Sequence, residues 1–319
     1  MIDKEKFINA LKSDDQKLIE EIPKSDIHNH ATRGGNINYV LAGIVDEIPI
    51  CPGKLNSLDN MQIWYDKNVK PHCQGREGFE RRIRGAFLQA KNDGITELVL
   101  SFGIGDSVHF SYDYKEYINS ISKIHKEIAP KINFYPEISF SRTNNIEPIL
   151  EIIDEILSLD FFRSVDLTGN DMDPVYNFVK IYRKAKLKGL VLKAHVGEFG
   201  SAESIKEVVE ILDLDEVQHG INAIHSREVM DFLKERQTIL NICPSSNVIL
   251  GIIKDYKDHP IGKLYRYGIP VTINSDDMLI FNNSVSDDYL KLLKSGVLEA
   301  EELNEIREFG IKVLKEINK

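Results

Sequence analysis

Side chains able to bind a metal ion or to move a proton gather in a few short segments of the chain. They are His28, His30, Asp166, His195, Glu198, His219, Asp276 and Asp277. Neutral imidazole is a common ligand of zinc, and carboxylate oxygens bind the same ion. A carboxyl group or a further imidazole beside such an ion can act as a general acid or base. These segments lie far apart in the sequence, so only the fold can bring them together.

Most of these residues stand at or near the end of a short β-rich run bounded by Gly, Pro, Asn or Asp, which is typical of buried parallel strands. The eight expected strands are Asp26–His30, Glu97–Phe102, Ile132–Ile138, Ser164–Leu167, Leu190–His195, Glu216–His219, Thr238–Ile242 and Pro270–Asn274. In a barrel of parallel strands the carboxyl ends converge on one rim, where barrel enzymes place their chemistry.

Helical patterns separate most of the expected strands. One covers Pro174–Lys188, with Asp173 as its expected N-cap, and another covers Ala202–Leu212 after Ser201. There is no GxGxxG and no GxxxxGK[ST] motif, and the absence of these signatures disfavours the open-sheet nucleotide-binding folds. Repeated strand–helix units without a domain break predict an α/β fold, a single (β/α)₈ TIM barrel over residues 1–319.

The residue types predict a metal site with nitrogen and oxygen ligands. His28 and His30 alternate along a strand, so both imidazoles face the same side, where His195 and Asp276 would join them. The alternative is a closed structural site, but structural zinc sites favour cysteine and no cysteine is expected near these ligands. Taken singly, each residue has a plainer explanation, such as a buried core histidine or a helix cap.

Residues 36–78 do not follow the strand–helix pattern. This segment contains Cys51, Trp64 and His72, and its periodicity is weak. After the first strand of a barrel it would lie at the active-site end, where long insertions form lids or pocket walls. A structural loop that covers the barrel is the alternative.

The composition restricts the partners and the compartment. The chain has 319 residues and a formal net charge of −10, which disfavours a nucleic acid partner. No apolar run approaches the length of a membrane helix, and the first 21 residues predict an amphipathic helix without an apolar signal core. Three scattered cysteines fit a reducing cytoplasm. The oligomeric state is not indicated.

Six motifs, in order along the chain, resemble those of the adenosine deaminase family. They are Pro23–His30 with its His-x-His, Val165–Gly169, His195–Glu198, His219-Gly220, Cys243–Asn247 and Ser275–Asp277. They span most of the chain. The resemblance implies a metal-dependent hydrolase that removes the amino group of a purine and releases ammonia.

The resemblance also implies a role for each site residue. The ligands of one zinc ion would be His28, His30, His195 and Asp276. Glu198 would protonate a ring nitrogen, and His219 would orient or deprotonate the attacking water. Asp277 and the backbone of Gly169 would bind ring nitrogens, with Asp166 also expected at the substrate. Bound zinc lowers the pKa of water from about 15.7 to about 7, which supplies the nucleophile at neutral pH.

The sequence departs from the family pattern where the sugar would bind. The family usually has Leu-Asp-Gly after the second histidine, whereas this chain has Ala31–Gly35, with Thr32 and Arg33 as the expected substrate contacts. A guanidinium can bind an anion through paired hydrogen bonds. We therefore expect a substrate other than plain adenosine, with an anionic or altered substituent or without ribose. The alternative is that Arg33 points to solvent or pairs with an acid such as Asp46.

Other functions remain open at this stage. The chain could deaminate another aminated heterocycle or an adenine nucleotide. It could belong to the wider amidohydrolases, many of which use two metals bridged by a modified lysine on the fourth strand, where this sequence has Asp166 and no lysine. It could also be an inactive purine-binding relative, although such a protein would be free to lose Glu198 and His219.

Overall fold

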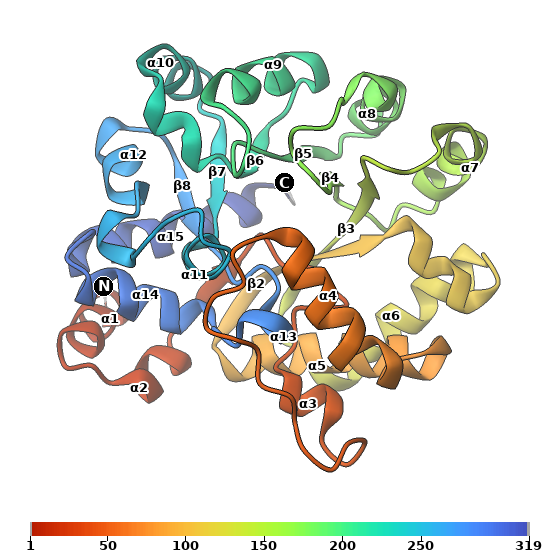
Figure 1. The fold of residues 1–319 in the computed structure, drawn as a ribbon, viewed down its shortest axis with the longest axis horizontal. Helices are drawn as coiled ribbons and strands as arrows, with labels where there is room; N and C mark the ends of the chain where they lie inside the picture. Colours follow the sequence, from red (N-terminus) through yellow and green to blue (C-terminus); the bar gives the residue numbers. More distant parts are fainter. Residues whose placement is uncertain (1, 318–319) are drawn as a thin grey trace.

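The computed structural model describes residues 2–317 and contains one eight-stranded parallel sheet (Figure 1). Its strands, in spatial and sequence order, are β1 (Lys24–Asp26), β2 (Ile95–Gly103), β3 (Asn133–Ser141), β4 (Ser164–Thr168), β5 (Val191–Val196), β6 (Glu216–His219), β7 (Ile239–Ile242) and β8 (Val271–Ile273). A parallel bridge between Asn29 and Asp276 joins the two ends of the sheet. The predicted (β/α)₈ barrel is confirmed.

Helices surround the barrel and cover one of its ends. The outer helices are α5 (Gly75–Asn92), α6 (Tyr114–Ile128), α7 (Ile146–Ser158), α8 (Val179–Leu187), α9 (Ala202–Leu212), α10 (Arg227–Arg236), α12 (Ile261–Tyr267), α14 (Val285–Lys294) and α15 (Ala300–Ile317). Near the active-site rim lie α3 (Ile37–Leu41), α4 (Leu58–Asn68), α11 (Pro244–Ile249) and α13 (Met278–Phe281), while α1 (Ile2–Lys12) and α2 (Gln16–Glu21) precede the barrel. Short 3₁₀ turns are η1 (Lys70–His72), η2 (Ile104–Phe110), η3 (Tyr176–Phe178), η4 (Ile221–His225) and η5 (Tyr256–Asp258).

The local sequence explains why the helices form where they do. The α9 helix occupies the predicted range, the Ser201 hydroxyl accepts a hydrogen bond from the Ser204 backbone at its start, and apolar residues such as Ile205 and Val209 are buried. No helix within residues 2–317 is both long and apolar enough to cross a membrane.

Several expected elements have other bounds in the structure, and the first strand and the first two helices differ most clearly. The first strand is Lys24–Asp26 rather than Asp26–His30, because the chain leaves the β1–β2 register after Asp26 and His30 instead bridges Ser101. The expected N-terminal helix is two helices, since Asp14 has φ +57° and breaks the first one.

The helix expected at Pro174–Lys188 begins later, at Val179. Asp173 does not cap it: the N-cap position is Phe178, which offers no side-chain hydrogen bond, and η3 precedes the helix. The backbone carbonyl of Asp173 instead accepts a hydrogen bond from Arg142, so the loop after β4 belongs to the barrel rim.

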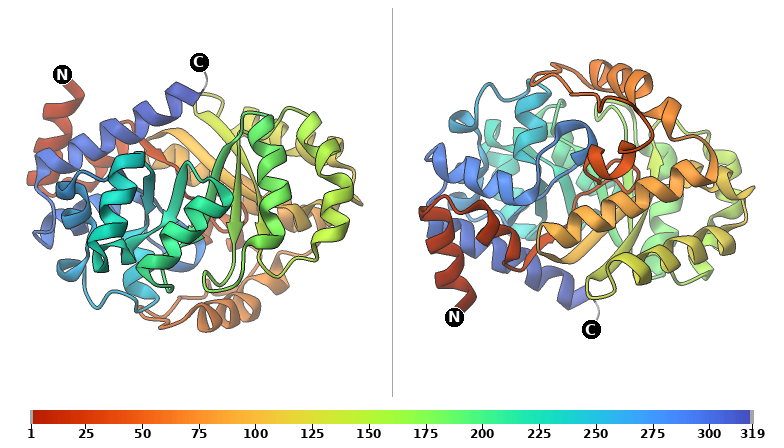
Figure 2. Two further views of the ribbon diagram at one scale, coloured as in Figure 1. Left: turned by 90° about the horizontal axis from the view of Figure 1, so that it is seen from above. Right: turned by 90° about the horizontal axis from the view of Figure 1, so that it is seen from below.

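The segment at residues 36–78 forms helices α3 and α4 and turn η1, which the weak periodicity did not predict. Both views of Figure 2 place α4 on the side of the molecule opposite the C-terminus. The segment has an apolar cluster of its own, in which Leu41, Met61 and Tyr65 pack with Leu250, the residue after α11, and Leu279 of α13. It therefore rests on the helices that follow β7 and β8.

Candidate active site

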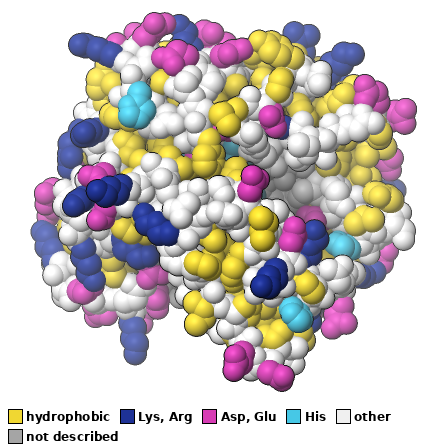
Figure 3. Space-filling model, viewed as in Figure 1, with side chains coloured by type: hydrophobic (Ala, Val, Ile, Leu, Met, Phe, Trp, Pro, Cys, Tyr) yellow, Lys and Arg dark blue, Asp and Glu magenta, His cyan; other side chains and the backbone are white. Residues whose placement is uncertain are grey.

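A cavity of about 620 Å³ opens at the carboxyl end of the barrel. His30, His195, Glu198, His219, Asp276 and Asp277 all line it, together with Leu58 and Met61 from α4. Figure 3 shows the surface hollowed near the middle of this face, with acidic side chains at the edge. The structure thus brings together residues that are up to 249 positions apart in pairs such as Asp26 and Ser275.

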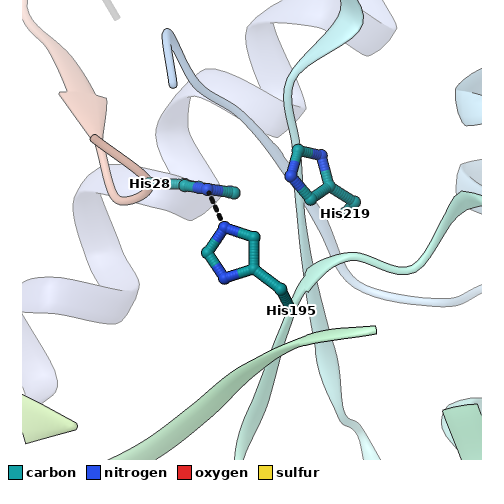
Figure 4. Close-up of side chains that lie close together, drawn as sticks. All are labelled: His28, His195 and His219. Carbon is teal, nitrogen blue, oxygen red and sulfur yellow. Dashed lines mark hydrogen bonds between the residues drawn. The ribbon is translucent and has the colours of Figure 1, made fainter. Parts of the chain in front are cut away.

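His28 and His195 point toward one another across the barrel (Figure 4). Nδ1 of His28 lies 3.2 Å from the carbonyl oxygen of Asn241, which can only accept a hydrogen bond, so Nδ1 carries the hydrogen. Nδ1 of His195 lies 3.3 Å from Oδ1 of Asp166 and donates in the same way. Both Nε2 atoms therefore keep a lone pair, and they lie 3.1 Å apart.

Asp276 completes this group of donors from the opposite side. Its Oδ1 lies 3.2 Å from Nε2 of His30 and 3.7 Å from Nε2 of His28. Two ligands of a tetrahedral zinc, each about 2.0–2.1 Å from the ion, lie roughly 3.4 Å apart. The donor spacing and the two facing lone pairs therefore fit a divalent cation.

Other donors lie beside the four expected ligands, and each compact group of ligand atoms contains two of those four. Ligand atoms that are mutually within 4.8 Å form three overlapping groups: His28 with His195 and His219, His28 with Cys243 and Asp276, and His30 with Asp276 and Asp277. The expectation that no cysteine lies near the ligands is wrong, because Sγ of Cys243 is 3.3 Å from Nδ1 of His28. The thiol faces the nitrogen that points away from His195, and burial raises its pKa well above the ordinary value.

Burial keeps the imidazoles of His28 and His219 neutral, whereas the carboxylates of Asp277 and Asp276 outweigh burial at His30 and raise its pKa to about 9. Burial lowers the pKa of His28 to about 3 against the opposing charge of Asp276. Burial and the nearby His28 also hold the pKa of His219 well below its ordinary value. Neutral imidazole is the form that binds metal.

Glu198 lies beside this group in a loop that the fold holds tightly. Asp171 accepts hydrogen bonds from the backbone of Glu198 and Gly200 at 2.8 and 3.1 Å, and Asn222 donates to the Glu198 carbonyl at 3.0 Å. Burial, with the charges of Asp276 and Asp171, raises the pKa of Glu198 well above its ordinary value. The carboxyl group is thus able to hold a proton at neutral pH.

His219 and Asp276 both adopt left-handed backbone conformations, with φ +67° and +59°. Such conformations are costly for residues other than glycine and concentrate at functional sites. They turn the two side chains toward the cavity at the ends of β6 and β8. Oε1 of Glu198 lies 3.4 Å from Nδ1 of His219.

Arg33 forms an ion pair with an acid, as the alternative reading of the sequence allowed, but the acid is Asp277 rather than Asp46. Its guanidinium donates to Asp277 at 3.0 Å and to Gln62 of α4 at 2.8 Å, and lies 4.5 Å from the ring centre of Tyr65. Thr32 and Gly169 line the cavity as expected.

Asp166 requires a correction. It was expected at the substrate, yet it is fully buried beneath His195 and orients that imidazole. Residues of β4 alternate between the barrel interior and the helices, and Asp166 occupies a deep interior position. The sequence analysis also missed Asp171, Asn222 and Asn247, although Asn247 ends a motif that the resemblance includes.

Comparison with known proteins identifies the family. A family model described as adenosine deaminase matches residues 153–314. A Treponema pallidum protein named as an adenosine/adenine deaminase is 29% identical over 291 residues, which cover 89% of this chain and 97% of the relative.

Solved structures share the fold. Adenine deaminase from Arthrobacter aurescens aligns with a TM-score of 0.77 at 22% identity, over 93% of this chain and 98% of that one. The N6-methyl-AMP deaminase from Arabidopsis thaliana aligns with a TM-score of 0.78 at 18% identity, over 95% and 97%. The matched family model covers half of the chain, and the protein therefore belongs to the adenosine deaminase family, as a hydrolase that deaminates aminated heterocycles.

Proposed function

We propose that this protein is a zinc-dependent hydrolase that removes the 6-amino group of an uncharged aminopurine. One observation supports it above the others: the buried Glu198 and His219 lie 3.4 Å apart beside the imidazoles of His28, His30 and His195 and the carboxylate of Asp276. An acid, a polar N–H group and a cation site are what hydrolytic deamination of a ring requires.

One zinc ion is assigned to four side chains by this proposal. They are His28, His30, His195 and Asp276. Held by these residues, a zinc ion would supply Lewis-acid activation of the attacking water. Asp166 and the Asn241 carbonyl accept hydrogen bonds from Nδ1 of His195 and of His28, and they thereby fix the tautomers of the two rings.

Glu198 supplies the proton that makes the ring an electron acceptor. The raised pKa favours the protonated carboxyl group, and the cavity gives it access to a bound purine. Protonation of the ring nitrogen beside the amino-bearing carbon lets water add to that carbon. His219 lies next to Glu198 and is assigned to the attacking oxygen.

The charges around the cavity favour a substrate without phosphate. Apart from the protonated Glu198, the carboxyl groups of Asp59, Asp106, Asp276 and Asp277 line the cavity, whereas Arg33 is the one Lys or Arg among its described lining residues. The charge of Arg33 is already balanced by Asp277 at 3.0 Å. A 5′-phosphate would thus meet carboxylates without a free cation.

Asp277 further favours the free base. Its Oδ2 accepts from Arg33, while its buried Oδ1 has no hydrogen-bond partner among the described residues. An ion-paired carboxylate can only accept, so the ligand atom that faces it must be a hydrogen-bond donor. Adenine carries an imidazole N–H, which an N9-substituted nucleoside lacks. We therefore place adenine ahead of adenosine.

The two-metal alternative receives no support from the strands. Lys193 is two residues before His195 on β5, but its amine is buried between Glu137 and Glu216 at 3.2 Å from each. It is therefore bound in the barrel interior rather than placed between two metal ions.

A substrate panel tests the proposal. Zinc-loaded protein is assayed for ammonia release with adenine, adenosine and adenosine 5′-phosphate. We expect kcat/KM for adenine to exceed that for adenosine by at least tenfold, about 1.4 kcal/mol of transition-state preference. The 5′-phosphate is expected to be the poorest substrate. A preference for the phosphate would refute the charge argument, and no ammonia from any member would refute the proposed reaction.

A further inference from the structure

Two residues behind the cavity connect Glu198 and His219. Asn247 is fully buried in α11, and His259, just before α12, is only 3% exposed. Neither lines the cavity. The ring of His259 contacts Asn247.

The hydrogen on His259 can be assigned from its neighbours. The backbone N–H of Ile261 donates to Nδ1 of His259 at 3.2 Å, so Nδ1 carries no hydrogen. Burial lowers the pKa of His259 to about 3, and the neutral ring must therefore carry its hydrogen on Nε2. That Nε2 lies 3.3 Å from Oδ1 of Asn247 and donates to it.

This contact fixes the orientation of the Asn247 amide. With its oxygen turned to His259, the NH₂ group faces the active site, where it carries two hydrogens. Nδ2 lies 2.9 Å from Oε1 of Glu198 and 3.3 Å from Nδ1 of His219. One amide group can therefore donate to both residues at once.

We propose that Asn247, held by His259, is a positioning residue that fixes where the hydrogens of Glu198 and His219 lie. Because Oε1 of Glu198 accepts from Asn247, the acidic proton is left on Oε2. Because Nδ1 of His219 accepts, the ring hydrogen is on Nε2, which lies 4.0 Å from Oδ2 of Asp276. His219 then donates a hydrogen bond to the reacting oxygen and does not remove its proton. The inference rests on the proposed function for the roles of these two residues.

The first test observes the tautomer directly and needs no turnover. Imidazole ¹⁵N shifts are measured in zinc-loaded protein, with a His219→Gln variant used to assign the His219 signals. We expect the Nε2–H tautomer in the natural protein and a gain of the Nδ1–H form in Asn247→Leu. Asn304→Leu is the matched control, because Asn304 is equally buried but lies in α15 beside Arg307. A Nδ1–H tautomer in the natural protein, or no change in Asn247→Leu, would overturn the proposal.

The second test compares rates. We expect kcat of Asn247→Leu to fall on the order of 10²-fold, with zinc content and KM little changed. General acid–base groups accelerate a reaction by about 10²–10⁴-fold, and this effect depends on their alignment with the substrate. His259→Leu should lose about tenfold, whereas His259→Gln, which restores an N–H donor, should stay within about threefold. Equal losses in the two His259 variants would refute the proposal that His259 holds Asn247 in position.

The His259 pair also keeps the proposal testable if Asn247→Leu fails to fold. Loss of zinc from Asn247→Leu would show a structural role and refute positioning. If no purine is deaminated but the tautomer shifts as expected, the proposed function fails and the positioning role stands.

Discussion

Nε2 of His28 lies 3.1 Å from Nε2 of His195, and neither nitrogen carries a hydrogen to donate to the other. Asn241 and Asp166 take up the hydrogens on the opposite sides of the two rings. Two lone pairs so close repel one another unless a cation lies between or beside them. Asp166 contacts the ring of His195 but is not among the proposed ligands, so a substitution of Asp166 tests the metal site without removing a ligand.

Asp166→Asn should weaken zinc binding by about 10- to 100-fold, because the carboxylate that orients His195 and raises its basicity is lost. The natural protein should contain one zinc per chain by elemental analysis, and affinity is measured by chelator competition. Asp160→Asn, at an exposed position of the loop before β4, should bind zinc normally. Two equivalents of zinc in the natural protein would contradict the single-ion site.

Glu198→Gln should keep zinc and lose nearly all turnover. The amide is similar in shape to the acid but has no proton to give to the ring nitrogen, and removal of a general acid costs about 10²–10⁴ in rate. Steady-state kcat and zinc content are measured together. If the variant keeps more than about a tenth of the natural kcat, the role assigned to Glu198 is wrong.

His219→Ala should retain zinc and substrate affinity but lose kcat, because its N–H group acts on the reacting oxygen. Loss of one such donor typically costs on the order of 10²–10³ in rate. His195→Ala provides the contrast, since loss of a ligand should release the metal. Zinc loss from His219→Ala would place His219 among the ligands.

Arg33→Met should lower kcat/KM for adenine by more than tenfold. Without the guanidinium, the buried Asp277 loses its ion pair and no longer presents a fixed acceptor to the purine. Arg84→Met is a suitable control, because Arg84 pairs with Glu127 away from the cavity. An unchanged preference between adenine and adenosine would show that Arg33 does not determine specificity.

Lys193→Met should destabilise the fold by about 3–5 kcal/mol, because Glu137 and Glu216 would keep buried charges without a partner. Chemical denaturation measures the free energy of unfolding. Lys184→Met removes an exposed pair with Asp154 and should cost no more than about 1 kcal/mol. Similar losses in both variants would mean that the buried triad contributes little.

The sequence alone determined the barrel and the rim on which its chemistry lies. Strands that are buried on both faces appear in the sequence as short β-rich runs. The polar residues at their ends do not follow the alternation that a solvent-exposed strand face would produce, which indicated a site. Ala202–Leu212 and Glu216–His219 were predicted to the residue. These features are local, so the pattern of neighbouring residues was enough to reveal them.

Only the tertiary structure decided which partners the site residues have. Arg33 and Asp277 are 244 residues apart, and His259 reaches Glu198 only through Asn247. Asp166 became a support for His195 because its depth in the barrel is set by the closure and tilt of the whole sheet. Periodicity fixes which face a side chain takes, but contact across a closed barrel depends on all eight strands together, and no local pattern encodes it.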